Sequence, residues 1–329
     1  MALMKMKYLI FFLIFFCVAC ERYEEENVEL LHTESWSVDF TLASGNCVVY
    51  NDTLYVLFGR EEGGSAVEPS TKIRYAAMSN LADFEEEDLP LGARVNAATI
   101  VVGDKMYAGL GFRGRVYGDN SLLRDWWVYD FQSKKWSQLA DFPTEDVVAP
   151  IVWADEGYIY TLYGSNDGPS GVVYRYDISR NSWEVYSKAS KPWARYRALG
   201  GIVDGMLYCG GVSTFDSKQY WWRYDWRRNE WYECERVPKL ARFFASSVTI
   251  GDFIYVLGGR FFGGTETREH FYETIIFYDT KNDEWATFGR MEQAAENMIA
   301  FEYNGDLYWG LGQSADGSFV KKIYRREMK

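Results

Sequence analysis

The sequence predicts an all-β fold made of similar units that repeat along the chain. Its 329 residues are 48% apolar and 18% aromatic, a composition typical of a folded rather than a disordered chain. The clearest repeated feature is an apolar residue and a tyrosine, followed three or four residues later by a glycine. It occurs six times, with the tyrosines 47 to 53 residues apart, at Tyr55, Tyr107, Tyr160, Tyr208, Tyr255 and Tyr308. A period of this length indicates a repeat architecture.

Short polar turns precede the tyrosine pairs and separate strand-like segments. Asn51-Asp52, Gly103-Asp104 and Asp204-Gly205 are examples, and Gly, Asn and Asp tolerate the positive φ of tight hairpin turns. Between the turns the residues alternate apolar and polar, or are β-branched and aromatic, as from Ala98 to Val102. No stretch after the first twenty residues keeps a helical period for long, so the sequence predicts strands throughout.

A second signature marks the outer half of most units. A Tyr-Asp pair is followed, six residues after the aspartate, by a tryptophan. The four copies are Tyr129-Asp130 with Trp136, Tyr176-Asp177 with Trp183, Tyr224-Asp225 with Trp231, and Tyr278-Asp279 with Trp285. Because the tryptophan recurs from unit to unit, we expect it to pack between units, since a ligand site would need only one or two copies.

Together these signatures resemble the kelch motif, whose units are the blades of a β-propeller. The resemblance covers residues 34–329. Gly210-Gly211 and Gly258-Gly259 match the double glycine of the motif, whereas the other four copies keep only the second glycine. The resemblance implies a six-bladed kelch-type β-propeller of four-stranded blades, an arrangement that leaves no long exposed sheet edge.

The two ends of the chain are expected to share one blade. The sixth unit reaches residues 322–325 and the chain ends at residue 329, so we expect that the unit's outermost strand, the one that carries the repeated tryptophan, is missing. Ahead of the first unit lies a strand-like segment, residues 34–40, that contains Trp36. We therefore predict that this N-terminal strand completes the last blade and closes the ring.

The first residues resemble an export signal. Lys5 and Lys7 precede an apolar run, residues 8–19, that is too short to span a bilayer comfortably. Cys20 follows a small residue, as in the lipobox of bacterial lipoproteins. We expect a signal peptide at 1–19, lipidation of Cys20, an acidic tether at 20–33 and the propeller at 34–329. An ordinary secretory signal and a buried apolar segment are the alternatives.

The resemblance to lipoproteins also implies a location in the cell. The acidic stretch after Cys20 resembles the surface-export signal of Bacteroidetes-type lipoproteins, although a solvated acidic tether is the alternative. We expect a protein held by its lipid in the outer membrane of a Gram-negative bacterium, on the cell surface or the periplasmic face.

Charge and composition exclude several function classes. A formal net charge of −12 argues against a nucleic-acid partner, because phosphate binding needs clusters of Lys and Arg. The only two histidines, His32 and His270, leave little for a metal site or a Ser-His-Asp triad. We expect no cofactor and no metal. Beyond the signal and Cys20, three cysteines remain, and buried free thiols are expected.

The residues that differ from blade to blade are the candidates for a site. In kelch propellers the residue after the glycine and the start of the inner strand form one face around the central channel. The candidate ligand-binding residues on this face are Arg60, Arg94, Arg113, Asn166, Arg195, Arg197, Arg242 and Arg260. Converging guanidinium groups suit carboxylates, phosphates or sugar acids. The alternative is that these arginines pair with neighbouring acids and hold loops.

Three functions remain open. The first is a binding module whose arginine-rich mouth takes a glycan, an acidic small molecule or an envelope protein. The second is an enzyme similar to the six-bladed sialic-acid mutarotases, with Glu296 or Asp146 as acid or base beside Arg94, Arg195 or Arg242. The third is a structural subunit of an envelope complex. Kelch-type copper oxidases also share the fold, but their copper needs two histidines that the predicted mouth does not offer. The fold alone does not choose among these functions.

Overall fold

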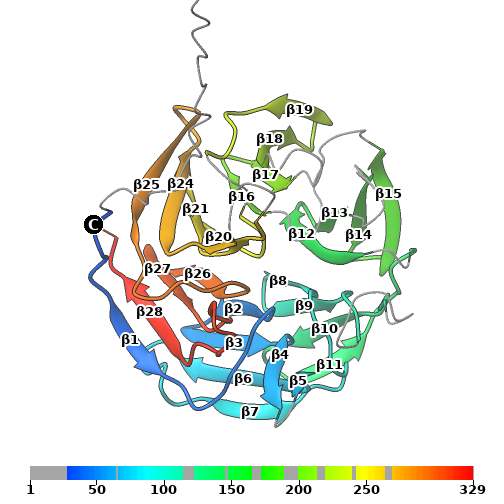
Figure 1. Cartoon of the computed structure of the whole chain (residues 1–329). Helices are drawn as coiled ribbons and strands as arrows, with labels where there is room; N and C mark the ends of the chain where they lie inside the picture. Colours follow the sequence, from blue (N-terminus) through cyan, green and yellow to red (C-terminus); the bar gives the residue numbers. More distant parts are fainter. Residues whose placement is uncertain are drawn as a thin grey trace, which may run out of the picture.

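The computed structural model describes most of the chain after the N-terminal segment. The described residues are 28–63, 66–113, 122–144, 147–164, 172–188, 199–212, 219–238, 242–263 and 269–328. Within them every regular element is a strand, and the strands form six four-stranded antiparallel sheets arranged as blades around an axis (Figure 1). The predicted six-bladed kelch-type propeller is confirmed.

Each blade runs from an inner strand beside the axis to an outer strand. Blades 1 and 2 contain β2 (Asn46–Tyr50), β3 (Thr53–Leu57), β6 (Lys72–Ala77) and β7 (Glu85–Asp88), then β8 (Ala98–Val102), β9 (Lys105–Gly109), β10 (Trp126–Asp130) and β11 (Lys135–Gln138). Blades 3 and 4 contain β12 (Val148–Asp155), β13 (Tyr158–Gly164), β14 (Val172–Asp177) and β15 (Ser182–Lys188), then β16 (Leu199–Val203), β17 (Met206–Val212), β18 (Gln219–Asp225) and β19 (Glu230–Glu233).

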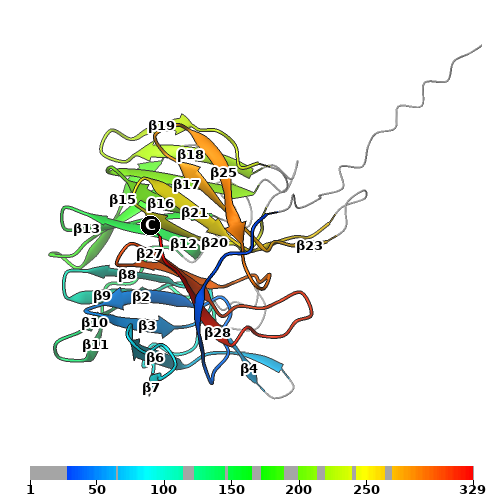
Figure 2. The same cartoon turned by 90° about the vertical axis from the view of Figure 1, so that its left-hand side faces the viewer.

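The last two blades complete the circle. Blade 5 contains β20 (Ser246–Ile250), β21 (Phe253–Leu257), β24 (Thr274–Asp279) and β25 (Glu284–Arg290). Blade 6 contains β26 (Ile299–Tyr303), β27 (Asp306–Gly310), β28 (Lys322–Arg326) and β1 (Glu34–Ser37). Two small hairpins, β4 (Arg60–Gly63) with β5 (Ala66–Pro69) and β22 (Arg260–Phe261) with β23 (His270–Phe271), extend from one face of the ring (Figure 2).

The N-terminal strand closes the ring as predicted. β1 pairs antiparallel with β28, so the two ends of the chain form the outer half of blade 6 (Figure 1). The register of Trp36 differs from the expectation. Trp36 lies opposite Ile323, whereas the repeated tryptophans lie opposite the tyrosine of the Tyr-Asp pair, as Trp285 does opposite Tyr278. By extension of the register, Thr33 takes the tryptophan position of blade 6.

Contacts with the propeller begin upstream of the expected boundary at residue 34. The amide of Leu31 donates to the carbonyl of Arg290, and the amide of Arg290 donates to the carbonyl of Glu29. Leu30 forms an isolated parallel β-bridge with Arg290. The segment expected to be the end of a tether therefore already bonds to the outer strand of blade 5 before it enters blade 6.

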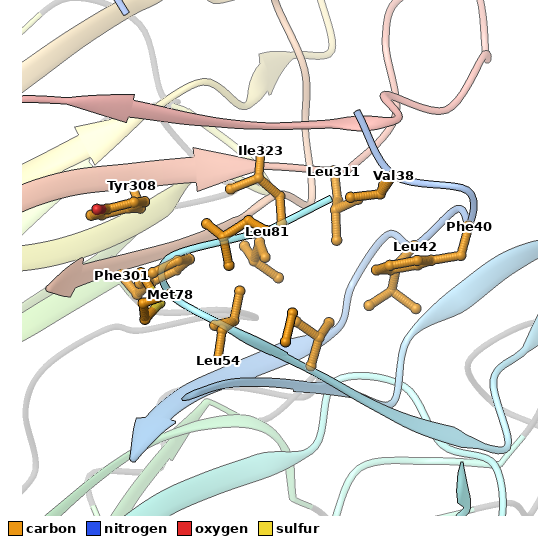
Figure 3. Close-up of a cluster of buried hydrophobic side chains, with 13 residues drawn as sticks. Val38, Phe40, Leu42, Leu54, Met78, Leu81, Phe301, Tyr308, Leu311 and Ile323 are labelled. Atoms are coloured by element: carbon orange, nitrogen blue, oxygen red, sulfur yellow. The ribbon is translucent and has the colours of Figure 1, made fainter. Parts of the chain in front are cut away.

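Apolar clusters fill the spaces between blades. One cluster between blades 6 and 1 contains Phe40, Leu42 and Leu54 together with Leu311 and Ile323 (Figure 3). Burying such side chains contributes roughly 1.5–3 kcal/mol each relative to exposure. The repeated tryptophans join these clusters. They were expected to pack between blades, and they do, at Trp136, Trp183, Trp231 and Trp285.

The second glycine of the motif is needed for a steric reason, as Gly59 shows. Gly59 has a φ of 88°, and a Cβ atom there would lie 2.7 Å from the carbonyl oxygen of Ala43. This close approach lets the next residue, Arg60, exchange backbone hydrogen bonds with Ala43. The preceding position keeps a left-handed φ even without glycine, at Phe58, Leu110 and Leu311. Burial of these apolar side chains offsets the backbone strain there.

Other expectations have simple outcomes. Cys47, Cys209 and Cys234 are free thiols. Cys209 lies on β17 and Cys234 follows β19, two strands that are not neighbours in their sheet. No helix long and apolar enough to cross a bilayer occurs in the described part of the chain. The expected signal peptide and Cys20 lie outside the described residues.

Candidate functional site

A small pocket of about 200 Å³ opens at one end of the central channel. It lies where the chain enters the inner strands of blades 1, 2, 5 and 6. Its lining consists of Ala43, Ser44, Arg60, Asn96, Phe244, Arg260, Glu296, Asn297, Gln313 and Phe319. We call it the mouth pocket. The lining includes two of the predicted arginines (Arg60 and Arg260), one acid (Glu296) and three amide side chains.

The backbone positions these side chains by a contact that recurs in several blades. The residue after the repeated glycine forms a β-bridge with a residue that lies three positions before the inner strand. The bridges that border the pocket are Ala43 with Arg60, Phe243 with Arg260, and Glu296 with Gln313. The post-glycine residues of these bridges all line the pocket, at Arg60, Arg260 and Gln313.

A ring of left-handed residues forms the floor of the mouth. Ser44, Asn96, Phe244 and Asn297 each lie eleven residues before the repeated tyrosine of their blade, and each has a φ of 53° to 62°. The amide of Ser44 donates to the carbonyl of Asn297, and that of Asn297 donates to the carbonyl of Phe244, at 3.0 and 2.8 Å. Neighbouring blades are thus joined by backbone hydrogen bonds, which makes the floor rigid.

Arg60 lines the pocket and forms no ion pair with any residue that the structure describes. Its backbone is bonded to Ala43, but its guanidinium forms no ion pair or hydrogen bond with any residue that the structure describes. Its Nε atom is buried. Burial lowers the pKa of Arg60 below its ordinary value, and the negative charge of Glu296 acts in the opposite direction. A buried guanidinium without a partner is costly, and a bound anion would remove that cost.

Arg260 and Glu296 form an ion pair across the boundary of blades 5 and 6. The Nε atom of Arg260 lies 2.9 Å from the Oε2 atom of Glu296, and its Nη1 atom lies 3.2 Å from Glu269. Glu296 is only 6% exposed. This carboxylate stands beside two guanidinium groups and holds one of them in place.

Aromatic side chains border the pocket on the side of blade 5. The guanidinium of Arg260 lies 4.3 Å from the ring centre of Phe262, which is 46% exposed. Phe262 also contacts Phe244, which lines the pocket. A flat exposed ring next to charged groups suits a ligand with one apolar face.

Arg94 and Arg242, which were predicted as ligand-binding residues, are buried and do not line the mouth pocket. Arg94 is fully buried, and its guanidinium pairs with Asp125 at 2.8 Å and donates to the carbonyl of Leu91. Arg242 is 4% exposed and donates to the carbonyl and hydroxyl oxygens of Thr274. Both hold loops together, the role that the alternative gave them.

The remaining candidates divide between the surface and the part of the chain that is not described. Arg113 is exposed and does not line the mouth pocket. Asn166, Arg195 and Arg197 lie outside the described residues, as does Asp146. Their assignment stays a prediction.

Sequence reasoning missed the polar floor residues Ser44, Asn96 and Asn297. A signal for them exists, because a serine or asparagine stands eleven residues before the tyrosine in three blades. Asn favours the left-handed region, so the pattern fits a tight entry into the inner strand. Among the residues described, no group of three His, Cys, Asp or Glu side chains could hold a metal ion.

Comparison with known proteins agrees with the propeller fold. The family described as Attractin/LZTR1 beta-propeller matches residues 54–308, more than three quarters of the chain. The chain belongs to this propeller family. Within the Attractin/LZTR1 beta-propeller family, the matched region runs from the inner half of blade 1 to that of blade 6.

Individual relatives of this Attractin/LZTR1-type propeller are distant. The chain is 24% identical over 249 residues to Kelch domain-containing protein 3 of Rattus norvegicus, and the alignment covers 65% of the chain and 63% of the relative. It is 26% identical over 250 residues to N-acetylneuraminate epimerase of Vibrio cholerae, covering 61% and 62%. The match spans less than two thirds of the length of these curated relatives. The solved structure of YjhT superposes with a TM-score of 0.69 at 14% identity, covering 87% and 95% of the two chains, and shows the shared fold.

Proposed function

We propose that this propeller is an envelope lipoprotein whose mouth pocket binds an acidic carbohydrate or a similar small carboxylate. The observation that carries the proposal is Arg60, a half-buried guanidinium that lines the pocket and has no anionic partner among the described residues. A carboxylate is the natural complement, because guanidinium binds it through two parallel hydrogen bonds.

The surroundings of Arg60 favour a small and partly polar ligand. The pocket volume of about 200 Å³ fits a carboxylate and the ring atoms next to it rather than a long chain. The amides of Asn96, Asn297 and Gln313 can donate to and accept from hydroxyl groups. The exposed ring of Phe262 offers a stacking face at the rim. These groups together suit a sugar acid better than an inorganic anion.

The membrane part of the proposal depends on the first twenty residues of the sequence. A short apolar run followed by Cys20 would attach the propeller to the outer membrane through a lipid. Growth in the presence of a radiolabelled fatty acid tests this, with Cys20→Ser as the control. Label in the wild-type chain and none in the variant supports the anchor, and unlabelled wild type refutes it.

A thermal-shift screen tests the ligand. The purified protein is heated with glucuronate, N-acetylneuraminate, glucose and sulfate, and the same panel is applied to Arg60→Met. Arg113→Met is the matched control, because this arginine is exposed and lies outside the pocket. We expect a sugar acid to raise the melting temperature of the wild type and of Arg113→Met by several degrees, but not that of Arg60→Met.

Two results would refute the binding proposal. One is a folded wild type whose melting temperature no sugar acid changes. The other is an equal shift for Arg60→Met. Either would favour an envelope protein as partner, or the role of a structural subunit.

A sugar-acid mutarotase is the second candidate. The buried carboxylate of Glu296 supports it, because this side chain lies in the pocket beside Arg60 and Arg260 and could move a proton. The distant relative named N-acetylneuraminate epimerase supports it further. Exchange of N-acetylneuraminate anomers, followed by NMR, tests this candidate. Faster exchange with wild type and loss of the effect with Glu296→Gln would support catalysis, and an unchanged exchange rate would exclude it for this substrate.

A further inference from the structure

A second and larger cavity lies between blades 5 and 6, away from the mouth pocket. Its volume is about 740 Å³. It lies where the hairpin turns of both blades, at Gly251 and Gly305, meet the N-terminal strand and the end of the chain. Its lining consists of His32, Glu34, Ile250, Gly251, Asp252, Phe253, Tyr255, Phe288, Gly305, Arg325, Arg326, Glu327 and Met328. We call it the wedge cavity.

In blades 2 to 5 a pair of aromatic side chains fills the corresponding wedge. The tyrosine of the Tyr-Asp pair faces the tryptophan across the outer two strands, with ring centres 4.1 to 5.2 Å apart. The tyrosine also reaches the preceding blade. Tyr278 of blade 5, for example, lies 5.7 Å from Tyr208 of blade 4.

Blade 6 lacks this pair. Arg326 lies opposite Leu307, the register position that Tyr278 occupies opposite Ile254 in blade 5. Thr33 takes the position of the tryptophan, because β1 is paired with Glu34 opposite Arg325. The wedge therefore receives a guanidinium in place of a tyrosine ring, and a threonine in place of an indole. A cavity remains between the two blades.

Two polar groups in the wedge cavity have unused hydrogen-bonding capacity. The Nη1 atom of Arg326 donates to the carbonyl of His32, but its Nε atom is buried without a hydrogen-bond partner among the described residues. The hydroxyl of Tyr255 also bonds to none of the described residues, although its oxygen is not among the fully buried ones. In blades 4 and 6 an arginine lies opposite the repeated tyrosine, Arg223 opposite Tyr208 and Arg325 opposite Tyr308. In blade 5 the residue opposite Tyr255 is Phe277.

The rest of the cavity divides into an aromatic wall and a charged rim. Phe253 and Phe288 stand on either side of Tyr255, with ring centres 6.5 and 5.2 Å from it. On the rim, Glu34 is paired with Arg325, and Asp252 is paired with Lys281. The third acid, Glu327, is exposed to solvent. Arg326 forms no ion pair with any described residue, so its charge is left for a ligand.

We propose that the wedge cavity is a second binding site, for a small organic carboxylate that carries a ring. The carboxylate would bind Arg326, the Tyr255 hydroxyl would bond to one of its oxygens, and the ring would pack against Phe253 and Phe288. A volume of about 740 Å³ lies within the range of ordinary small-molecule sites. An aromatic acid and a cyclic sugar acid share this chemistry, and the test separates them.

Isothermal titration with benzoate, glucuronate and the neutral benzamide tests the site on the purified protein. We expect benzoate or glucuronate to bind, and affinity to fall about tenfold in Arg326→Met. The same titrations are repeated in Arg60→Met, which removes a guanidinium from the mouth pocket, so that the binding that remains reports on the wedge cavity. Arg113→Met, at an exposed arginine that lines neither cavity, is the control that should leave the affinity unchanged. Stronger binding of benzoate would identify an aromatic acid, and stronger binding of glucuronate a sugar acid. Benzamide should bind more weakly than benzoate.

A refilled wedge provides the second test. Arg326→Tyr combined with Thr33→Trp restores the aromatic pair of the other blades, and should abolish binding without lowering the melting temperature. The proposal is overturned if neither carboxylate binds the folded wild type at millimolar concentration. It is also overturned if Arg326→Met binds as well as wild type, or if only Arg60→Met loses binding, which would assign the ligand to the mouth.

Discussion

The Nε atom of Arg260 lies 2.9 Å from the Oε2 atom of Glu296, across the boundary between blades 5 and 6. The charge of the same carboxylate also acts on Arg60. One acid thus faces two guanidinium groups, and it satisfies only one of them directly. The residues that line the mouth pocket therefore carry one more positive than negative charge, within a protein whose formal net charge is −12. That local excess makes an anionic ligand the expected occupant.

Glu296→Gln should weaken the fold and strengthen anion binding. The substitution leaves Arg260 half-buried with only the exposed Glu269 as partner, so we expect a loss of about 2 kcal/mol in unfolding free energy. It also removes the negative charge that competes with a ligand at Arg60. Urea unfolding and titration with glucuronate measure the two effects. Weaker glucuronate binding in the variant would contradict the assignment of Glu296 as a competing anion.

Arg94→Met should lower stability and leave ligand binding alone. Arg94 is fully buried and its loss leaves Asp125 without its cation, so unfolding free energy should fall by about 3 kcal/mol. Arg113→Met, at an exposed arginine, should change stability by less than about 0.5 kcal/mol. Chemical denaturation of the three proteins gives the comparison. Loss of glucuronate binding in folded Arg94→Met would return this residue to the site.

The same ion pair predicts a pH dependence of stability. Burial alone would raise the pKa of Asp125, but hydrogen bonds and charge from Arg94 outweigh it, and the pKa lies below its ordinary value of 3.8. The pair therefore stabilises the fold fully above that value, and its contribution is lost as pH falls through the lowered pKa. In Arg94→Met, burial acts on Asp125 without its cation and raises its pKa, so the stability gap between wild type and the variant should be widest near about pH 7 and should shrink on acidification. A gap that widens on acidification would contradict this.

Trp36→Ala should test the closure of the ring. Trp36 lies 6.4 Å from Tyr308 and packs against the cluster between blades 6 and 1, so its removal should cost about 2 kcal/mol. Leu30→Ala is the control, because Leu30 is half exposed and holds blade 5 through its backbone. Thermal unfolding measures both variants. Equal melting temperatures would mean that the N-terminal strand contributes little to the closed ring.

The repeat made the fold predictable, and the mouth could be predicted only in part. Arg60 and Arg260 follow the glycines of their blades, so the period alone placed them on one face, and the structure brings both to the mouth pocket. Arg94 was assigned to the start of an inner strand from its spacing to the repeated tyrosine, thirteen residues before Tyr107. Its direction depends on Asp125, a loop residue 31 positions away that the period does not place.

Registers at the ends of the chain were harder to predict. Trp36 had the residue type expected of a repeated tryptophan, but it lies only 19 residues before Tyr55, against 23 to 25 for the other gaps. The structure explains the short gap, because Thr33 holds the tryptophan position. A single strand without a repeat of its own carries no period, so only its pairing fixes its register. The wedge cavity, which depends on this register, could not be predicted from the sequence.

The most direct measurement of the central claim is a double-mutant cycle at the mouth. Glucuronate and its neutral amide, glucuronamide, are titrated calorimetrically into wild type and Arg60→Met. If Arg60 binds the carboxylate, removing either charge should weaken binding about tenfold, and removing both should cost little more than one. If the two losses add independently, or if Arg60→Met binds glucuronate as tightly as wild type, the carboxylate is bound elsewhere and the account of the mouth pocket is wrong.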